Sequence, residues 1–213
     1  MELNEGLIRI EHPPHPETYK KNRFPLFCIL RKGTLFILIF ILSFHFSTSS
    51  SGFNFNQREQ AIKEILEVLE RQPTDLASVT KEELAEVIYE EAIRYHHDPK
   101  FILALIAFES SFQNWSVSER GAKGLMQIMP YVAESLAHEL GIEWSGDRTL
   151  FNPYLNIKMG SYYLAQLIKE FNDLRLASAA YNYGPTYIKS LKEKNERIPT
   201  HYFYRIRTIY QTL

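Results

Sequence analysis

One glutamate interrupts an otherwise apolar segment of this chain. Glu109 follows the run FILALIAF, residues 101–108, and precedes the glycine-containing stretch SERGAKGLMQIMP, residues 118–130. Because Glu109 is four residues past Leu105 and three past Ile106, we expect it to share their buried side of a helix. Burial penalises the charged form of a carboxyl group and raises its pKa, so the group holds a proton near neutrality and is able to donate it. Protonation of a glycosidic oxygen is a reaction that needs such an acid.

Two other interpretations concern acidic and metal-binding side chains. A buried glutamate is also compatible with a structural role, in which a lysine or an arginine neutralises its charge. His96 and His97 stand beside Asp98, but no further cluster of ligands follows them, so we interpret them as the end of a helix and predict no metal site.

The elements that position Glu109 are predicted to be helices. Apolar residues recur at helical spacing from Gln57 to Gln72, where Pro73 ends the segment. Thr80 with Glu83 three residues later forms a capping-box pattern and begins a second helix. Asp98 followed by Pro99 is a strong start for the helix that carries Glu109.

The remaining sequence continues the helical pattern. We expect four further helices, at residues 131–140, 152–171 and 174–182 and from about residue 200 onward. No alternating strand pattern, internal repeat or linker occurs between residues 80 and 213. The sequence therefore predicts an all-α class.

Composition limits the possible partners. The chain has 213 residues, of which 45% are hydrophobic, which is enough for one domain with a sizeable core and an extension. Its 24 basic and 25 acidic residues give a net charge of -1, so no strong field attracts a polyanion, and we do not expect nucleic acid as a partner.

The first 52 residues have the pattern of an export signal or a membrane anchor. Residues 20–32 contain five basic residues and no acidic one, residues 34–46 form the apolar run TLFILIFILSFHF, and STSSSG follows at residues 47–52. The apolar run is shorter than the roughly 20 residues of a transmembrane helix and fits a signal sequence. About 30 residues precede the run, which is long for a signal, so removal after export and retention as an inner-membrane anchor both stay open. In either case the sequence predicts a protein that is exported across a membrane or held at one, and the family resemblance described below implies the periplasm or the cell envelope.

Four sequence blocks carry a resemblance to a known family. The stretch ESSFQNWSVSERGAKGLMQIMP, residues 109–130, resembles the signature of the lytic transglycosylase SLT domain, which has a lysozyme-like fold of the goose-lysozyme type. HHDP precedes it, and NPYLNIKMGSYYL, residues 152–164, and AAYNYGP, residues 179–185, follow in the expected order. The expected organisation is an N-terminal segment at 1–52, a lead-in helix and connection at 53–79, and a catalytic domain at 80–213.

The resemblance implies roles for six residues. Glu109 corresponds to the family's single catalytic acid, and Ser118 to a loop serine whose hydroxyl lies beside that acid. The resemblance also places these side chains at the sugar-binding cleft: Ser118, Gln127, Met129, Tyr181 and Asn182. Two other acids, Glu119 and Asp147, match no catalytic position.

The resemblance also implies an activity, cleavage of the β-1,4 bond between N-acetylmuramic acid and N-acetylglucosamine in peptidoglycan. The acid would protonate the leaving oxygen, and the muramic acid's C6 hydroxyl would attack C1 to close a 1,6-anhydro ring without water or a cofactor. The alternatives are a goose-type lysozyme-like hydrolase, which needs a second acid, and a non-catalytic wall-binding assembly subunit. The implied partners are glycan strands, with membrane attachment through residues 34–46 and envelope assembly partners left open.

Two positions depart from the family pattern. The family commonly has a Glu-Thr pair shortly before a tyrosine near its C-terminus, whereas this chain has Thr200 and His201 ahead of Tyr204. Tyr183 replaces a small residue within AYN-x-GP, and we expect its larger side chain to narrow a subsite.

Overall fold

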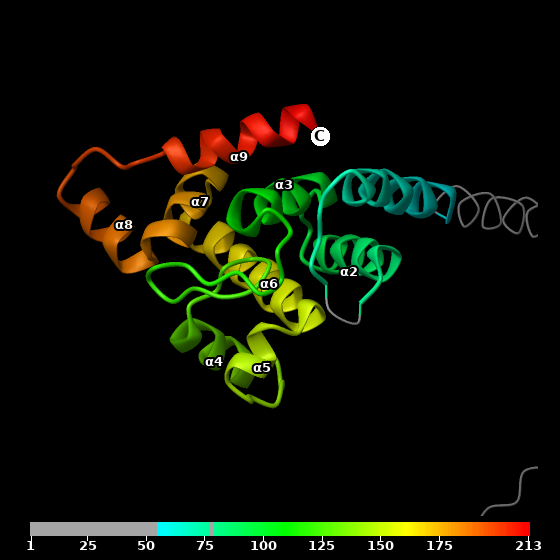
Figure 1. Cartoon of the computed structure of the whole chain (residues 1–213). Helices are drawn as coiled ribbons and strands as arrows, with labels where there is room; N and C mark the ends of the chain where they lie inside the picture. Colours follow the sequence, from blue (N-terminus) through cyan, green and yellow to red (C-terminus); the bar gives the residue numbers. More distant parts are fainter. Residues whose placement is uncertain (1–54, 77–78) are drawn as a thin grey trace, which may run out of the picture. The chain divides into compact units, whose positions relative to one another are not determined.

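The computed structural model describes residues 55–76 and 79–213 of the chain (Figure 1). The described residues all belong to the unit Phe53–Leu213. The predicted signal or anchor lies outside the described residues. Within the described ranges, none of the helices has the length and apolar character that a membrane span requires.

The described part of the chain is helical. Residues 55–70 are helical, and eight labelled helices follow: α2 (Lys81–Arg94), α3 (Pro99–Ser110), α4 (Pro130–Glu139), α5 (Asp147–Leu150), α6 (Pro153–Phe171), α7 (Leu174–Tyr183), α8 (Pro185–Glu193) and α9 (His201–Thr212). Extended pairing in residues 55–76 and 79–213 is limited to isolated bridges. The all-α prediction is confirmed, while the short helices α5 and α8 were not predicted.

Two caps fix where α2 and α3 begin. The Thr80 hydroxyl accepts a hydrogen bond from the Glu83 N–H at 3.1 Å, and the Glu83 carboxylate accepts one from the Thr80 N–H at 2.9 Å. Asp98 accepts a hydrogen bond from the Lys100 N–H at 2.9 Å, and Pro99 occupies the first turn of α3. Such caps satisfy N–H groups that have no partner within the helix. The start of α3 in turn sets which residues reach its C-terminal end.

Helix α3 belongs to the core of the domain. Its residues Ile102–Ile106 are fully buried, as expected for a helix that is apolar on all sides. Figure 1 shows α9 running beside α3, and the two helices pack closely together. Glu109 lies in the last turn of α3, where the helix leaves the core. The fold therefore places this carboxyl group at the inner edge of the surface.

Helix α6 supports the loop that follows Glu109. Asn156 is completely buried, and its Oδ1 accepts a hydrogen bond from the Met126 N–H at 2.8 Å. Its Nδ2 donates to the carbonyl groups of Lys123 and Leu150 at 3.1 and 2.9 Å. A side chain at Gly160 would overlap Met126, so the glycine allows the loop to lie directly on α6.

Candidate active site

The Glu109 carboxyl group lies among aromatic side chains. It accepts a hydrogen bond from the hydroxyl of Tyr202, which comes from α9 and is 2% exposed. The Tyr202 ring also contacts Phe108 edge-on, at 5.2 Å between ring centroids. Burial raises the pKa of Glu109 to about 7, and the hydrogen bond from Tyr202 acts in the opposite direction. A carboxyl group with this pKa is partly protonated at neutrality, as a general acid must be.

A structural ion pair does not explain Glu109. Among residues 55–76 and 79–213, no lysine or arginine forms a salt bridge with its carboxylate. Its polar partner is a neutral phenol, which stabilises a carboxylate less than a cation does. The geometry thus favours the chemical interpretation of this glutamate over the structural one.

Tyr181 joins α7 to the loop and is influenced by the charge of Glu109. Its hydroxyl donates a hydrogen bond to the Met126 carbonyl at 2.8 Å, and its ring packs against Tyr163 at 5.3 Å between centroids. Burial, followed by the negative charge of Glu109, raises the pKa of Tyr181 well above its ordinary value. The phenol therefore stays protonated and donates the hydrogen bond that joins α7 to the loop.

Ser118 and Gln127 hold the loop in shape. The Ser118 hydroxyl accepts a hydrogen bond from the Ala122 N–H at 2.9 Å. Gln127 has a left-handed backbone, with φ of 49°, and its side-chain amide donates to the carbonyl groups of Ser116 and Gly124 at 3.0 and 2.9 Å. Within the described part of the chain, no hydrogen bond joins either side chain to Glu109. These contacts are those of loop supports.

A groove of about 830 Å³ lies between α4 on one side and α7 and α8 on the other. Four of the predicted binding residues line it: Gln127, Met129, Tyr181 and Asn182. Five tyrosines also contribute to its lining: Tyr131, Tyr163, Tyr181, Tyr183 and Tyr187. Glu109 and Ser118 are not part of this lining. Tyr181 is the residue that belongs both to the groove and to the surroundings of the acid.

Tyr202 and Asn156 are two site residues that the sequence interpretation did not identify. Tyr202, and not Tyr204, is the buried tyrosine of α9, because Tyr204 is 47% exposed. The spacing of Tyr202 with Ile206 and Ile209 on one face of the helix is the signal that distinguishes the two tyrosines. Asn156 stands in the block NPYLNIKMGSYYL, and a polar residue within a helix's buried stripe is its only local signal.

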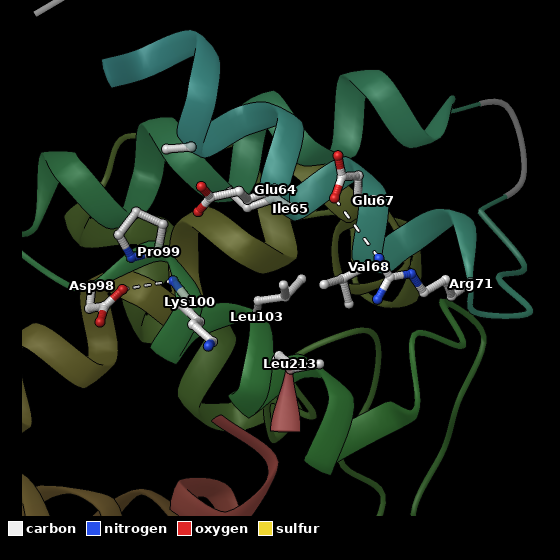
Figure 2. Close-up of a pocket in the computed structure, with 11 residues that line it drawn as sticks. Glu64, Ile65, Glu67, Val68, Arg71, Asp98, Pro99, Lys100, Leu103 and Leu213 are labelled. Carbon is white, nitrogen blue, oxygen red and sulfur yellow. Dashed lines mark hydrogen bonds and ion pairs between the residues drawn. The ribbon is translucent and has the colours of Figure 1, made fainter. Parts of the chain in front are cut away.

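Two other hollows of the described surface include residues with structural contacts. One of about 240 Å³ lies between the helical segment 55–70 and the start of α3. Figure 2 shows residues of its lining, among which Glu67 pairs with Arg71 at 3.9 Å and Asp98 caps α3. Another hollow includes His97, whose Nε2 forms a 2.8 Å hydrogen bond with the Ser161 carbonyl oxygen. Burial lowers the pKa of His97, which agrees with a neutral histidine at a helix end.

Comparisons with known proteins place the matched region around this site. Residues 86–203 match the family model described as the transglycosylase SLT domain. The chain is 36% identical over 92 residues to the soluble lytic murein transglycosylase of Salmonella typhimurium, covering 42% of this chain and 14% of that protein. It is 39% identical over 82 residues to membrane-bound lytic murein transglycosylase C of Actinobacillus pleuropneumoniae, covering 38% of this chain and 22% of that protein.

A solved structure of an inactive mutant of lytic transglycosylase Slt from Pseudomonas aeruginosa aligns with 59% of this chain and 21% of its own, at 30% identity and a TM-score of 0.48. The chain thus spans less than a quarter of the length of each of these three proteins.

Proposed function

Since this chain belongs to the transglycosylase SLT-domain family, we propose that it is a lytic transglycosylase that cleaves peptidoglycan. The bond cleaved is the β-1,4 linkage between N-acetylmuramic acid and N-acetylglucosamine. The observation that carries this proposal is the Glu109 carboxyl group, which has a pKa of about 7 and whose charge acts on Tyr181, a residue of the tyrosine-lined groove.

Glu109 performs both proton transfers of the reaction. Its protonated form donates to the glycosidic oxygen as the bond to C1 breaks. The resulting carboxylate takes the proton of the muramic acid's C6 hydroxyl, whose oxygen attacks C1 and closes the 1,6-anhydro ring. A pKa of about 7 leaves both forms accessible at neutral pH. The hydrogen bond from Tyr202 stabilises the carboxylate between the two steps.

The groove supports a polysaccharide substrate. Tyrosine offers an apolar ring face and a polar hydroxyl, which suits a sugar that has both kinds of surface. We assign Gln127, Met129, Tyr181 and Asn182 to substrate binding because they line the groove. Ser118 is assigned to positioning of the loop that forms one side of the cleft.

A hydrolase of the same class is the second candidate, because a second carboxylate lines the groove. Glu139 on α4 is part of the lining, and it accepts hydrogen bonds from Tyr162 at 3.1 Å and from Gln166 at 2.7 Å. Asp147 is instead paired with Lys123 at 2.6 Å, and Glu119 is exposed in the loop. Glu139 is therefore the carboxylate to test as a base that activates water.

We place the protein in the bacterial envelope, either exported or held at the inner membrane by residues 34–46. The basic and apolar pattern of residues 20–46 supports this location. The N-terminal sequence of the protein isolated from membranes and from the periplasm distinguishes removal of the segment from its retention.

Digestion of purified peptidoglycan tests the proposed function. The full chain, purified in a mild detergent, should release fragments with 1,6-anhydromuramic acid ends, which mass spectrometry finds one water lighter than hydrolysis products. Glu109→Gln should lower the rate by at least about 10²-fold, as expected for loss of a general acid. Glu119→Gln is the matched control and should retain activity.

Other results of the same digestion would support one of the alternative functions. Reducing, non-anhydro ends that disappear in Glu139→Gln would identify a hydrolase. An active Glu109→Gln protein would refute the role of the acid, and an inactive wild-type protein that still binds glycan would indicate a wall-binding subunit.

A further inference from the structure

Tyr183 and His201 meet at the edge of the groove. Tyr183 is the last residue of α7 and lines the groove, while His201 is the first residue of α9. A 2.7 Å hydrogen bond joins the Tyr183 hydroxyl and His201 Nε2, and the two rings lie edge-on with centroids 5.8 Å apart. This contact ties together two helices that the whole of α8 separates in the sequence.

The pair is adjacent in sequence to two tyrosines of the acid's environment. His201 immediately precedes Tyr202, which donates the hydrogen bond to Glu109. On α7, Tyr183 is two residues past Tyr181, whose pKa is raised in part by the charge of Glu109. The Tyr183–His201 contact therefore lies close in sequence to both tyrosines of the acid's environment.

Tyr183 also extends the aromatic wall of the groove. Tyr187 on α8 packs against it at 6.3 Å between centroids, is 49% exposed, and also lines the groove. The hydrogen bond to His201 restricts the direction of the Tyr183 ring, so this wall is ordered before a ligand arrives. A preformed wall reduces the entropy lost when a sugar ring packs on it.

Both residues stand at places where the sequence departs from the family pattern, His201 within the pair Thr200–His201 and Tyr183 within AYN-x-GP. A small residue at position 183 would not reach α9, and a threonine at position 201 is too short to contact the Tyr183 hydroxyl at its present place. The two departures therefore produce one contact that neither would produce alone.

We propose that Tyr183 and His201 form a specificity-determining rim of the groove, in which His201 orients the Tyr183 ring as one wall of a muramyl glycan subsite. This inference rests on the proposed function, because it assumes that a glycan strand occupies the groove. The alternative is a tether that joins α7 to α9 without contacting the ligand. Exposed hydrogen bonds contribute little to stability, so the two roles differ in what a substitution changes.

Binding in the absence of turnover separates these roles. In the Glu109→Gln background, purified glycan fragments of alternating N-acetylglucosamine and N-acetylmuramic acid are titrated into the full chain in detergent by calorimetry. Tyr183→Phe and His201→Ala should each weaken binding by roughly 3- to 10-fold, as expected for loss of one oriented contact. The double variant should bind no more weakly than the weaker single variant, because both changes remove the same contact.

Two control substitutions remove the same kinds of chemical group, a phenol hydroxyl and an imidazole, at positions outside the groove. Tyr204→Phe removes an exposed phenol from α9, and His138→Ala removes an exposed histidine from α4; both should bind glycan like the parent. In the active enzyme, Tyr183→Phe should raise KM by a similar factor and leave kcat nearly unchanged.

The outcomes distinguish this inference from the proposed function. If Tyr183→Phe and His201→Ala leave the glycan affinity unchanged, with or without a lower melting temperature, the proposed role of the pair in glycan binding is refuted. Additive losses in the double variant would overturn the coupling between the two residues. Absence of anhydro ends in the wild-type digestion would instead refute the lyase assignment, whatever the binding experiments give.

Discussion

The stability of Glu109→Gln should depend on pH in a defined way. Glutamine keeps the shape of the side chain and retains an oxygen that accepts the hydrogen bond from Tyr202. It removes only the ionisation of the carboxyl group. Any pH-dependent difference in unfolding free energy between the two proteins therefore reports the linkage between folding and the ionisation of Glu109.

The sign follows from the direction of the pKa shift. In the folded protein the pKa of Glu109 is about 7, whereas its ordinary value is 4.5, so the folded state binds the proton more tightly than the unfolded state. The stabilisation of the folded wild type that comes from this proton is fully present below pH 4.5 and is lost as the pH rises through 7. A pKa difference of one corresponds to about 1.4 kcal/mol, so the full loss is roughly 3.5 kcal/mol. Because the side chain is partly accessible to solvent, we expect roughly 2 kcal/mol.

Urea unfolding measures this difference. The free energies of unfolding of the wild type and Glu109→Gln should differ least at pH 4, and the variant should become the more stable protein by about 2 kcal/mol at pH 8. Glu119→Gln, which removes an exposed glutamate, controls for the general effect of one charge. A difference that stays constant between pH 4 and pH 8, or that favours the wild type at high pH, would refute the burial argument.

Three further predictions concern the surroundings of the acid. Tyr202→Phe removes the hydrogen bond that lowers the pKa of Glu109, so the alkaline limb of the pH–rate profile should move to higher pH; an unmoved limb would contradict this. Gln127→Ala removes two hydrogen bonds to loop carbonyl groups, so it should lower the free energy of unfolding by about 1–3 kcal/mol and also lower turnover. Unchanged stability in urea would show that the side chain contributes to ligand binding and not to the loop. Gly124→Ala combines a left-handed backbone, with φ of 80°, and a clash with a buried amide, so it should cost roughly 2–4 kcal/mol, against about 1 kcal/mol for Gly121→Ala, whose added Cβ meets open space. Equal losses for the two glycines would show that packing against the loop is unimportant.

Local features of the sequence were sufficient to predict the helices that carry the acid. Thr80 with Glu83, and Asp98 with Pro99, act within one helical turn, so their pattern is visible without the fold. The apolar character of residues 101–108 also predicted that Glu109 would be buried. These features depend on neighbours in the chain, and the structure confirms the helices at those places.

Contacts between distant segments were not predictable from such patterns. Tyr202 and Glu109 are 93 residues apart, and Asn156 and Met126 are 30 apart, so neither pair has a periodic signal. Similarly, Ser118 and Gln127 were identified through the family signature, but which groups they bind depends on how the loop folds onto itself. Side-chain partners of this kind follow from tertiary packing.

The identity of the residue beside Glu109 is itself informative about the chemistry. An arginine or a lysine in place of Tyr202 would favour the ionised carboxylate and lower its pKa by roughly 1–3. The group would then be ionised at neutral pH and unable to begin the reaction as an acid. A fully apolar neighbour would keep the proton on Glu109 but would leave the carboxylate without a donor after the first transfer. A phenol donates one hydrogen bond without adding a positive charge, so it supports the carboxylate while burial holds the pKa near 7. The role that we propose for Glu109, first as an acid and then as a base, requires this balance.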